Sequence, residues 1–283
     1  MAERAPNLVT VGDNCLDVYL TKAVLTVGGC ALNVAAHWRR AGLPARYFGA
    51  VGDDAEAAIL LDAIAKAGLA LDDVERRAGP TAVTLLREQD GDRIFVLEEL
   101  GVGKDYLPRE PDYPKIAKAD WVHLGLNANP VLVRRLATDR VPFSLDLSTA
   151  HDSLPLEGVP LVFASGPEAP DAPVEPIAAR LNRAGARDVV ITCGSRGAFF
   201  RGADGRLLHA PATPVAVLDT CGAGDCFIAA FIAAFVGNRP AAAALREAAA
   251  AAAQTCLHLG GFPQQARRIP DWLLDKYAAV IAR

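Results

Sequence analysis

Short apolar runs alternate with amphipathic stretches along most of this chain. Runs that end in a polar or glycine turn predict buried strands, and apolar residues recurring every three or four positions predict helices. The expected strands are Leu8–Val11, Ala45–Val51, Leu69–Val74, Trp121–Leu124, Phe143–Leu147, Leu161–Ala164, Asp188–Thr192 and Val215–Leu218. The expected helices are 28–41, Glu56–Ala67, Val131–Ala137, Ile177–Ala184, Cys226–Val236, Ala241–Leu259 and Asp271–Ala282. This alternation indicates βαβ units, a parallel sheet and therefore an α/β fold.

Two hairpins interrupt the alternation. The first joins Thr81–Arg87 to Arg93–Glu98 through the polar turn Gln89–Asp92, and the second joins Ala198–Arg201 to Arg206–His209. Short β-prone segments on either side of a polar or glycine turn favour such hairpins. The first hairpin, together with Val18–Val27, either forms a small separate sheet over a site or lies at the edge of the main sheet.

A glycine turn late in the chain is the first candidate site. The run Val215–Leu218 ends at Asp219, and Gly222-Ala223-Gly224 then precedes Asp225 and an apolar helix. Small residues beside the unpaired amides of a helix N-terminus form a site for phosphate. A carboxylate there repels a bound anion, but it serves a reaction that removes a proton from an attacking hydroxyl. The alternative is that Asp225 only caps the helix.

A second candidate site lies near the N-terminus. Asn33 stands among apolar neighbours just after the pair Gly28-Gly29, so it either satisfies a nearby backbone group or faces a polar ligand. Asp146 ends a predicted strand with a carboxylate, at the edge of the sheet where ligands of α/β proteins bind.

Composition narrows the function classes. The chain has 283 residues, 52% hydrophobic and 22% charged, so it can bury a core. A net charge of −4 without a basic block argues against nucleic acid as a partner. No apolar run is long enough to span a bilayer, and no secretory signal is evident, so we expect no membrane partner and a cytoplasmic location. The six cysteines form no C-x-x-C pair and are expected to be reduced, and no histidine has metal-site spacing.

The segment DTCGAGD (219–225), followed by CFIAAF, resembles the C-terminal signature of the PfkB, or ribokinase-like, family of sugar kinases. The N-terminal signature is similar too, and the resemblance covers essentially the whole chain. The residues that carry this N-terminal match are Gly28, Gly29, Ala31, Asn33, Ala35, Gly42 and Gly52. Segments such as GDNCLD and GGCALNVA look most similar to the fructoselysine 6-kinase branch of the family.

The resemblance implies a three-layer α/β/α ribokinase-like fold with a mostly parallel central sheet. It implies one kinase domain over residues 1–283, with a small β lid from about 16–27 and 81–98. It also implies transfer of the γ-phosphoryl group of ATP to a primary hydroxyl of a fructosamine or a related ketose derivative. A kinase for ribose, fructose, 2-keto-3-deoxygluconate or a nucleoside stays open, as does a non-catalytic regulator that binds sugar or nucleotide.

Roles for individual residues follow from the same resemblance. Asp225 matches the catalytic base, and Gly222, Ala223 and Gly224 match the anion hole. The sugar-binding positions are Asp17, Gly28, Gly29, Cys30 and Asn33, and the ATP-binding positions are Ser165, Thr192, Gly194, Ser195 and Gly197. Glu168 resembles the residue that supports Mg²⁺ through water. Asp219 lies where relatives bind a monovalent cation, commonly K⁺.

Three positions depart from the family pattern. Cys30 stands where fructoselysine kinases carry Asn and ribokinases carry Lys, Ser165 replaces an Asn, and Leu100 replaces an acidic residue. Polar groups in a sugar pocket discriminate strongly between substrates, so the acceptor is less firmly implied than the reaction. An exposed lid edge would also allow a homodimer to form.

Overall fold

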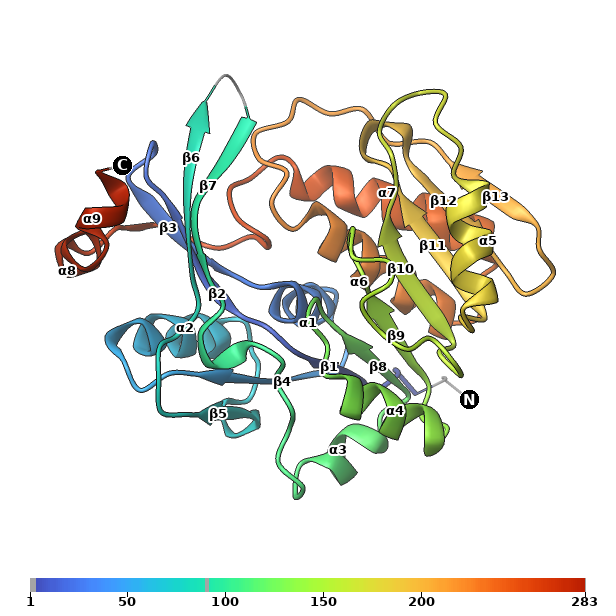
Figure 1. The fold of residues 1–283 in the computed structure, drawn as a ribbon, viewed down its shortest axis with the longest axis horizontal. Coiled ribbons are helices and arrows are strands. Elements are labelled where there is room, and N and C mark those ends of the chain that lie inside the picture. Colours follow the sequence, from blue (N-terminus) through green and yellow to red (C-terminus); the bar gives the residue numbers. More distant parts are fainter. Residues whose placement is uncertain (1–3, 90–91, 283) are drawn as a thin grey trace.

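A computed structural model describes residues 4–89 and 92–282, and every structural statement below concerns those residues. Its central element is a nine-stranded sheet (Figure 1). Across the sheet, the strands are β13 (Leu207–Ala210), β12 (Ala198–Arg201), β11 (Asp188–Thr192), β10 (Leu161–Ser165), β9 (Phe143–Asp146), β8 (Trp121–Leu124), β1 (Leu8–Val11), β4 (Ala45–Val51) and β5 (Val74–Arg76). All neighbouring strands from β11 to β5 pair in parallel, while β12 and β13 form an antiparallel hairpin at the edge. The predicted mostly parallel sheet is confirmed.

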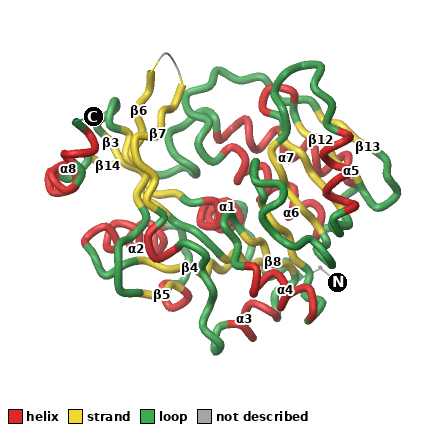
Figure 2. Tube along the Cα trace, in the orientation of Figure 1, coloured by secondary structure: helices red, strands yellow, loops and turns green. Residues whose placement is uncertain are grey.

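Helices cover both faces of this sheet (Figure 2). Alternate strand residues point to opposite faces, so Leu8 packs with α1 (Cys30–Arg40), α6 (Ala223–Val236) and α7 (Ala241–Thr255). Its neighbour Val9 packs into the opposite layer, with α3 (Tyr113–Ala117), α4 (Pro130–Thr138) and α5 (Glu175–Arg183). This arrangement confirms the three layers.

A five-stranded sheet stands apart from the main one. Its strand order is β14 (Arg267–Arg268), β3 (Val24–Gly28), β2 (Cys15–Tyr19), β6 (Val83–Gln89) and β7 (Asp92–Glu99). The hairpin of β6 and β7 therefore belongs to this small sheet and not to the edge of the main sheet. Residues Asp90 and Gly91 of the expected turn lie outside the described residues. The strand β14 was not predicted.

The small sheet packs on α2 (Ala55–Lys66) through a core of its own, which includes Leu16, Leu25 and Leu60. The short helices α8 (Asp271–Lys276) and α9 (Ala278–Ile281) complete its outer side (Figure 1). Its registered pairs align Thr26, Asp17, Thr84 and Glu98 in one row across four strands. Residues in such a row point to the same face of a sheet.

Several sequence predictions need correction. Val215–Leu218 is not a strand: Val217 and Leu218 are more than half exposed, because this extended segment pairs with no strand and runs beside a pocket. The predicted helix 241–259 ends at Thr255, and the last helix is interrupted at Tyr277. The predicted strand Leu69–Val74 is largely a 3₁₀ turn (Leu71–Asp73) leading into β5.

No helix in the described ranges has both the length and the apolar character needed to cross a membrane.

Candidate active site

Asp225 lies in the first turn of α6 and is only 8% exposed. Its Oδ2 accepts a hydrogen bond of 2.7 Å from Nδ2 of Asn33, a residue of α1 that is 192 positions earlier. The N-cap of α6 is Gly222, and the hydrogen bonds to the Asp225 carboxylate come from the side chains of Asn33 and Cys30 and from no described backbone amide. The capping alternative for Asp225 is therefore wrong, and the two signature segments meet in space.

Two roles were considered for Asn33, a hydrogen bond to a nearby backbone group and contact with a polar ligand, and its observed hydrogen bond matches neither of them. Its amide donates to Asp225, whereas its buried Oδ1 has no hydrogen-bond partner in the described protein. The buried Oδ1 of Asn14 also lacks a partner, while Nδ2 of Asn14 donates to Tyr47 and to the Ala50 carbonyl. Unpaired buried acceptors are costly. Both residues line one pocket of about 190 Å³.

The same pocket brings together most of the predicted sugar-binding residues. Asp17, Gly29, Cys30 and Asn33 line it, and so do Gly222 and Asp225. Gly28 does not line the pocket, but a larger residue would not fit at this position, because its Cβ would collide with Oδ2 of Asp17. Gly29 has φ +108°, and its Cβ would collide with the backbone of Asn14. The glycine pair thus lets β2 and the start of α1 approach closely.

Asp13 positions the start of α1. Its carboxylate accepts hydrogen bonds from the amides of Cys30 at 2.7 Å and Ala31 at 3.1 Å. These amides have no partner within the helix, and a carboxylate suits the positive end of the helix dipole. Asp13 therefore fixes Cys30 and, one turn later, Asn33 beside Asp225.

Packing and hydrogen bonds fix the segment 219–224, which contains the predicted anion hole. Gly222 has φ +69°, and a Cβ there would come closer than 3.0 Å to the backbone of Gly261, so only glycine fits. Asp219 is buried and accepts hydrogen bonds from Tyr19 Oη at 2.7 Å, Gly260 N at 3.0 Å and Cys221 N at 2.9 Å. These bonds fix the loop that leads into α6, and the cation role of Asp219 stays a prediction.

A second pocket of about 560 Å³ lies on the other side of the α6 N-terminus. Seven of the predicted residues line it, namely Thr192, Gly194, Ser195, Gly197, Glu168, Ala223 and Gly224. Ser165 does not line it, although it lies in register with Thr192 on the neighbouring strand. A Cβ added to Gly224 would meet open space, so the backbone of this first turn is accessible. The helix terminus therefore separates two pockets and faces both.

Burial and mutual repulsion dominate the electrostatics of the smaller pocket. Desolvation, with smaller effects of Asp146 and Asp13, raises the pKa of Asp225 to about 8, although the bonds from Asn33 and Cys30 oppose the shift. Desolvation likewise raises the pKa of Asp146 to about 6 and that of Asp13 above its usual range. Each shift has the sign expected for a carboxyl group removed from water.

Cys30, Asp146 and Asp225 form a group with their ligand atoms within 4.8 Å of one another, close enough to share a metal ion. Neither Glu168 nor Asp219 belongs to a group of this kind within the described residues. Glu168 lies at the rim of the larger pocket, packed against Gly194. An exposed carboxylate there suits a hydrated Mg²⁺ ion beside nucleotide phosphates.

Sequence reasoning missed several residues that line the smaller pocket, among them Asp13, Asn14, Glu98 and Lys104. Asp13 and Asn14 lie just after the strand β1, separated from it by Gly12, and a polar residue at a strand end is the same signal that singled out Asp146. Glu98 lies at the pocket because of the strand pairing in the small sheet, and Lys104 because of the loop that follows that sheet. No local sequence pattern predicts either position.

Comparison with known proteins agrees with this geometry. Residues 7–132 and 160–265 match the pfkB family of carbohydrate kinases. A fructosamine kinase, FrlD, of Bacillus subtilis (strain 168) is 34% identical over 269 residues, which cover 90% of this chain and 92% of the relative. A fructoselysine 6-kinase of Escherichia coli (strain K12) is 32% identical over 265 residues, covering 90% and 99%.

The fold has solved counterparts. Arabidopsis thaliana ribokinase, in a structure with ribose and ATP, superposes with a TM-score of 0.79 at 25% identity, covering 91% of this chain and 94% of that one. Thermotoga maritima ribokinase superposes with a TM-score of 0.78, at 18% identity. These comparisons confirm the expected ribokinase-like fold and the class of ATP-dependent kinase. The chain belongs to the pfkB family of carbohydrate kinases.

Proposed function

We propose that this enzyme transfers the γ-phosphoryl group of ATP to a primary hydroxyl of a fructosamine, a ketose that carries an amine on C1. Relatives named fructosamine kinase and fructoselysine 6-kinase support the acceptor class. The observation in this chain that carries the proposal is the surplus of carboxylates in the sugar pocket, where Lys104 is the only lysine or arginine among the described lining residues. A protonated amine suits such a pocket better than a neutral sugar does.

Glu98 has the right position for that amine. It lies on β7 in the row that contains Asp17, two strands away, so roughly 10 Å separates their Cα atoms. Glu98 also contributes to the raised pKa of Asp13, which places its charge near the pocket. With the reacting hydroxyl at Asp225, the amine at the opposite end of the ketose points toward the small sheet. We therefore assign the ammonium contact to Glu98.

The proposed mechanism uses residues already described. Asp225 takes the proton of the acceptor hydroxyl, and Asn33 holds the carboxylate in place through its 2.7 Å hydrogen bond. The amides of the first α6 turn stabilise charge on the phosphoryl group as it passes between the two pockets. Mg²⁺, held through water by Glu168, would neutralise the phosphate oxygens. The small sheet excludes water from the reaction.

A pair of substrates tests this function. Replacement of Glu98 by Gln should raise KM for fructoselysine about tenfold, because one charge-assisted contact is lost, and leave KM for fructose unchanged. The exposed Glu157, remote from the pocket, supplies a matched control, Glu157→Gln. Absence of turnover with every fructosamine would refute the proposed acceptor. An equal loss on both substrates would remove Glu98 from amine recognition while leaving the kinase assignment intact.

Three finer assignments accompany this proposal. We propose that residues 1–283 work as one kinase domain in the cytoplasm, where ATP is available, and that K⁺ binds near Asp219. We also propose a homodimer through β7, an edge strand on which Phe95 and Ile94 are 60% and 43% exposed. A sedimentation measurement of molecular mass tests the dimer.

A further inference from the structure

Three side chains of types that bind metal ions meet beside the smaller pocket. Cys30 opens α1, Asp225 lies in the first turn of α6, and Asp146 ends β9. Their ligand atoms, one thiol sulfur and two carboxylate oxygens, lie within 4.8 Å of one another, and we call these three residues the thiol–carboxylate cluster. Cys30 and Asp225 also line the pocket, so a dissolved ion that enters the pocket reaches them.

Neighbouring groups already orient the three side chains. Asn33 donates to Oδ2 of Asp225 at 2.7 Å, and the amide of Ser148 donates to Oδ1 of Asp146 at 2.8 Å. The side chain of Cys30 is hydrogen-bonded to Asp225. In metal sites, such outer hydrogen bonds fix the direction of the ligands and raise the affinity for the ion.

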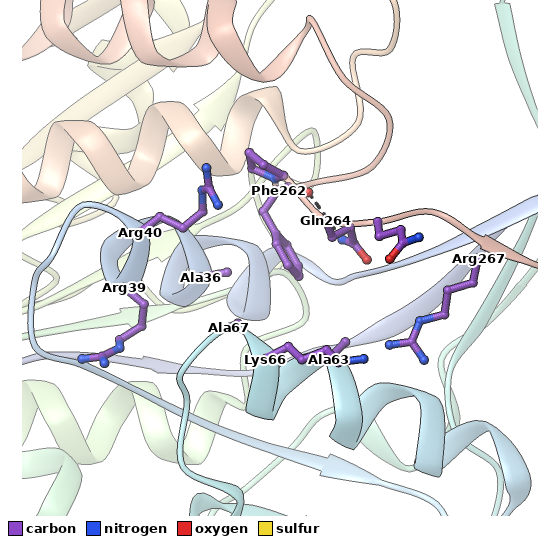
Figure 3. A pocket seen from close by; sticks show the side chains of 11 residues that line it. Ala36, Arg39, Arg40, Ala63, Lys66, Ala67, Phe262, Gln264 and Arg267 are labelled. Carbon is purple, nitrogen blue, oxygen red and sulfur yellow. Dashed lines mark hydrogen bonds between the residues drawn. The ribbon is translucent and has the colours of Figure 1, made fainter.

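Contacts outside the cluster hold the elements that carry it. Indole Nε1 of Trp38 in α1 donates a buried hydrogen bond of 2.8 Å to the carbonyl of Ala229 in α6. Before α1, the Gln264 side chain pairs with the amide and the carbonyl of Val27 on β3, at 2.8 and 2.7 Å. Phe262, which is 4% exposed, points between α1 and α2 (Figure 3). The ligands are thus ordered before an ion arrives, so little ordering cost opposes binding.

Two buried acceptors in the same pocket point to a polar occupant. Oδ1 of Asn33 and Oδ1 of Asn14 have no hydrogen-bond partner among the described residues, although the two residues are only 3% and 2% exposed. Both residues line the pocket together with Cys30 and Asp225. Buried polar atoms without a protein partner are normally satisfied by water or by an ion. The pocket therefore offers acceptors to water that an ion carries with it.

The charge around the cluster favours a cation. Asp13 and Glu98 also line the pocket, where Lys104 is the only lysine or arginine among the described lining residues. Desolvation, followed by the charge of Asp225, raises the pKa of the Cys30 thiol, so the thiol keeps its proton while no ion is bound. A divalent ion replaces this proton, which passes to the solvent, because a metal-bound thiol is deprotonated.

We propose that Cys30, Asp146 and Asp225 bind Zn²⁺ while the pocket holds no sugar, and that the ion and the acceptor exclude each other. Zn²⁺ takes thiolate and carboxylate ligands in four-coordinate sites, and three protein ligands leave the fourth position to water. Its bonds of about 2.0 to 2.3 Å place neighbouring ligand atoms roughly 3.5 Å apart, so small rotations of the side chains close the site. Mg²⁺ prefers six oxygen ligands, and a thiolate does not suit it.

The exclusion follows from the role of Asp225 in the proposed function. An ion bound to this carboxylate occupies the place of the acceptor hydroxyl and engages the oxygen that would take its proton. The exclusion therefore rests on the proposed function, whereas the binding of the ion does not. The site also depends on Cys30, which stands where the family pattern has Asn or Lys.

Cobalt spectroscopy tests the binding step without ATP or sugar. Co²⁺ occupies zinc sites, and its bond to a thiolate gives a charge-transfer absorption band. Titration of the full-length protein should produce this band at one equivalent of Co²⁺, and Zn²⁺ should displace the Co²⁺. Cys30→Ser should remove the band, and Asp146→Asn should weaken Co²⁺ binding about tenfold or more. Cys15→Ser is the matched control, because Cys15 lines the same pocket and is not one of the three ligands.

A band that persists in Cys30→Ser, or that Cys15→Ser removes, would overturn the proposal, since the ion would then bind elsewhere. The absence of a saturable band in the original protein would overturn it as well. Thermal melting separates loss of the site from loss of the fold. Zn²⁺ should raise the melting temperature of the original protein and of Cys15→Ser, because it binds only the native state, and should not raise that of Cys30→Ser.

Competition with the sugar tests the exclusion. Fructoselysine at about ten times its Kd should raise the Kd for Co²⁺ about tenfold, as expected for two ligands of one site. An unchanged Kd for Co²⁺ would refute the exclusion. If fructoselysine neither binds nor is phosphorylated, the proposed acceptor is wrong and the exclusion falls with it, whereas the Co²⁺ titrations of Cys30→Ser and Cys15→Ser still decide the metal site.

Discussion

Replacement of Asp225 by Asn should make the protein more stable while nearly abolishing its activity. The carboxyl group lies in a desolvated site, with Asp146 and Asp13 nearby, and its ionised form is therefore destabilised. Asparagine has almost the same shape, carries no charge, and keeps a carbonyl oxygen that can accept the hydrogen bond from Asn33. We expect kcat to fall by about 10² to 10⁴, the usual contribution of a positioned base.

The pKa shift sets the size and the sign of the stability change. The pKa is raised from 3.8 to about 8, so between these values the native state holds a proton that the unfolded state has released. Stability therefore falls as pH rises through this window and is constant above it. At pH 7 the carboxyl group costs on the order of 4 kcal/mol, and at pH 5 about 1 to 2 kcal/mol. The advantage of Asp225→Asn grows accordingly from pH 5 to pH 8.

Urea denaturation at pH 5 and pH 8, without ligands, measures this advantage directly. Asp275→Asn supplies the control, because Asp275 is exposed on α8 and forms no ion pair with a described residue. The control should change the free energy of unfolding equally at both pH values. If Asp225→Asn also gave a pH-independent difference, the carboxyl group would be ionised at both pH values, and the desolvated environment deduced for it would be wrong.

Two further predictions concern the same helix terminus. Gly222→Ala should destabilise the fold by about 1 to 3 kcal/mol and remove activity, because position 222 has a positive φ and its Cβ would collide with Gly261. Gly224→Ala should keep the stability and raise KM for ATP, because its Cβ enters open space at the proposed nucleotide pocket. Thermal melting and kinetics of both variants check this, and equal melting temperatures would contradict it. The pH profile of kcat/KM should rise toward a plateau above the Asp225 pKa of about 8, and a profile that is flat from pH 6 to pH 9 would exclude Asp225 as the base.

Residues with a local signature could be located from the sequence. The glycines at 28, 29 and 222 mark positions where the backbone must approach another segment or adopt a positive φ, and each does so. The hydrogen bond between Asn33 and Asp225 was not predicted, since 192 positions separate the two residues and the resemblance to a family gave each of them only a separate role. Apolar periodicity placed the helices and the inner strands because burial determines both.

Residues whose role depends on tertiary pairing could not be located in this way. Glu98 lines the smaller pocket, the proposed sugar site, because β7 pairs with β6 and β6 with β2, and a shift of one residue would turn it outward. Val215–Leu218 has the composition of a buried strand, yet no described strand pairs with it, and Val215 and Val217 line the larger pocket, the proposed nucleotide site. An apolar composition predicts that a segment will contact an apolar surface. It does not predict whether that surface belongs to the protein or to a ligand.

The charge distribution of the site links substrate choice to catalysis. Without a ligand, Asp225 is mostly protonated at neutral pH and cannot accept a proton. A cation placed in the same pocket stabilises the ionised carboxylate and lowers its pKa. The ammonium group of the proposed fructosamine supplies such a charge next to Glu98, whereas a neutral ketose does not. A cationic acceptor should therefore have a higher kcat as well as a lower KM, because its own charge favours the form of Asp225 that removes the proton.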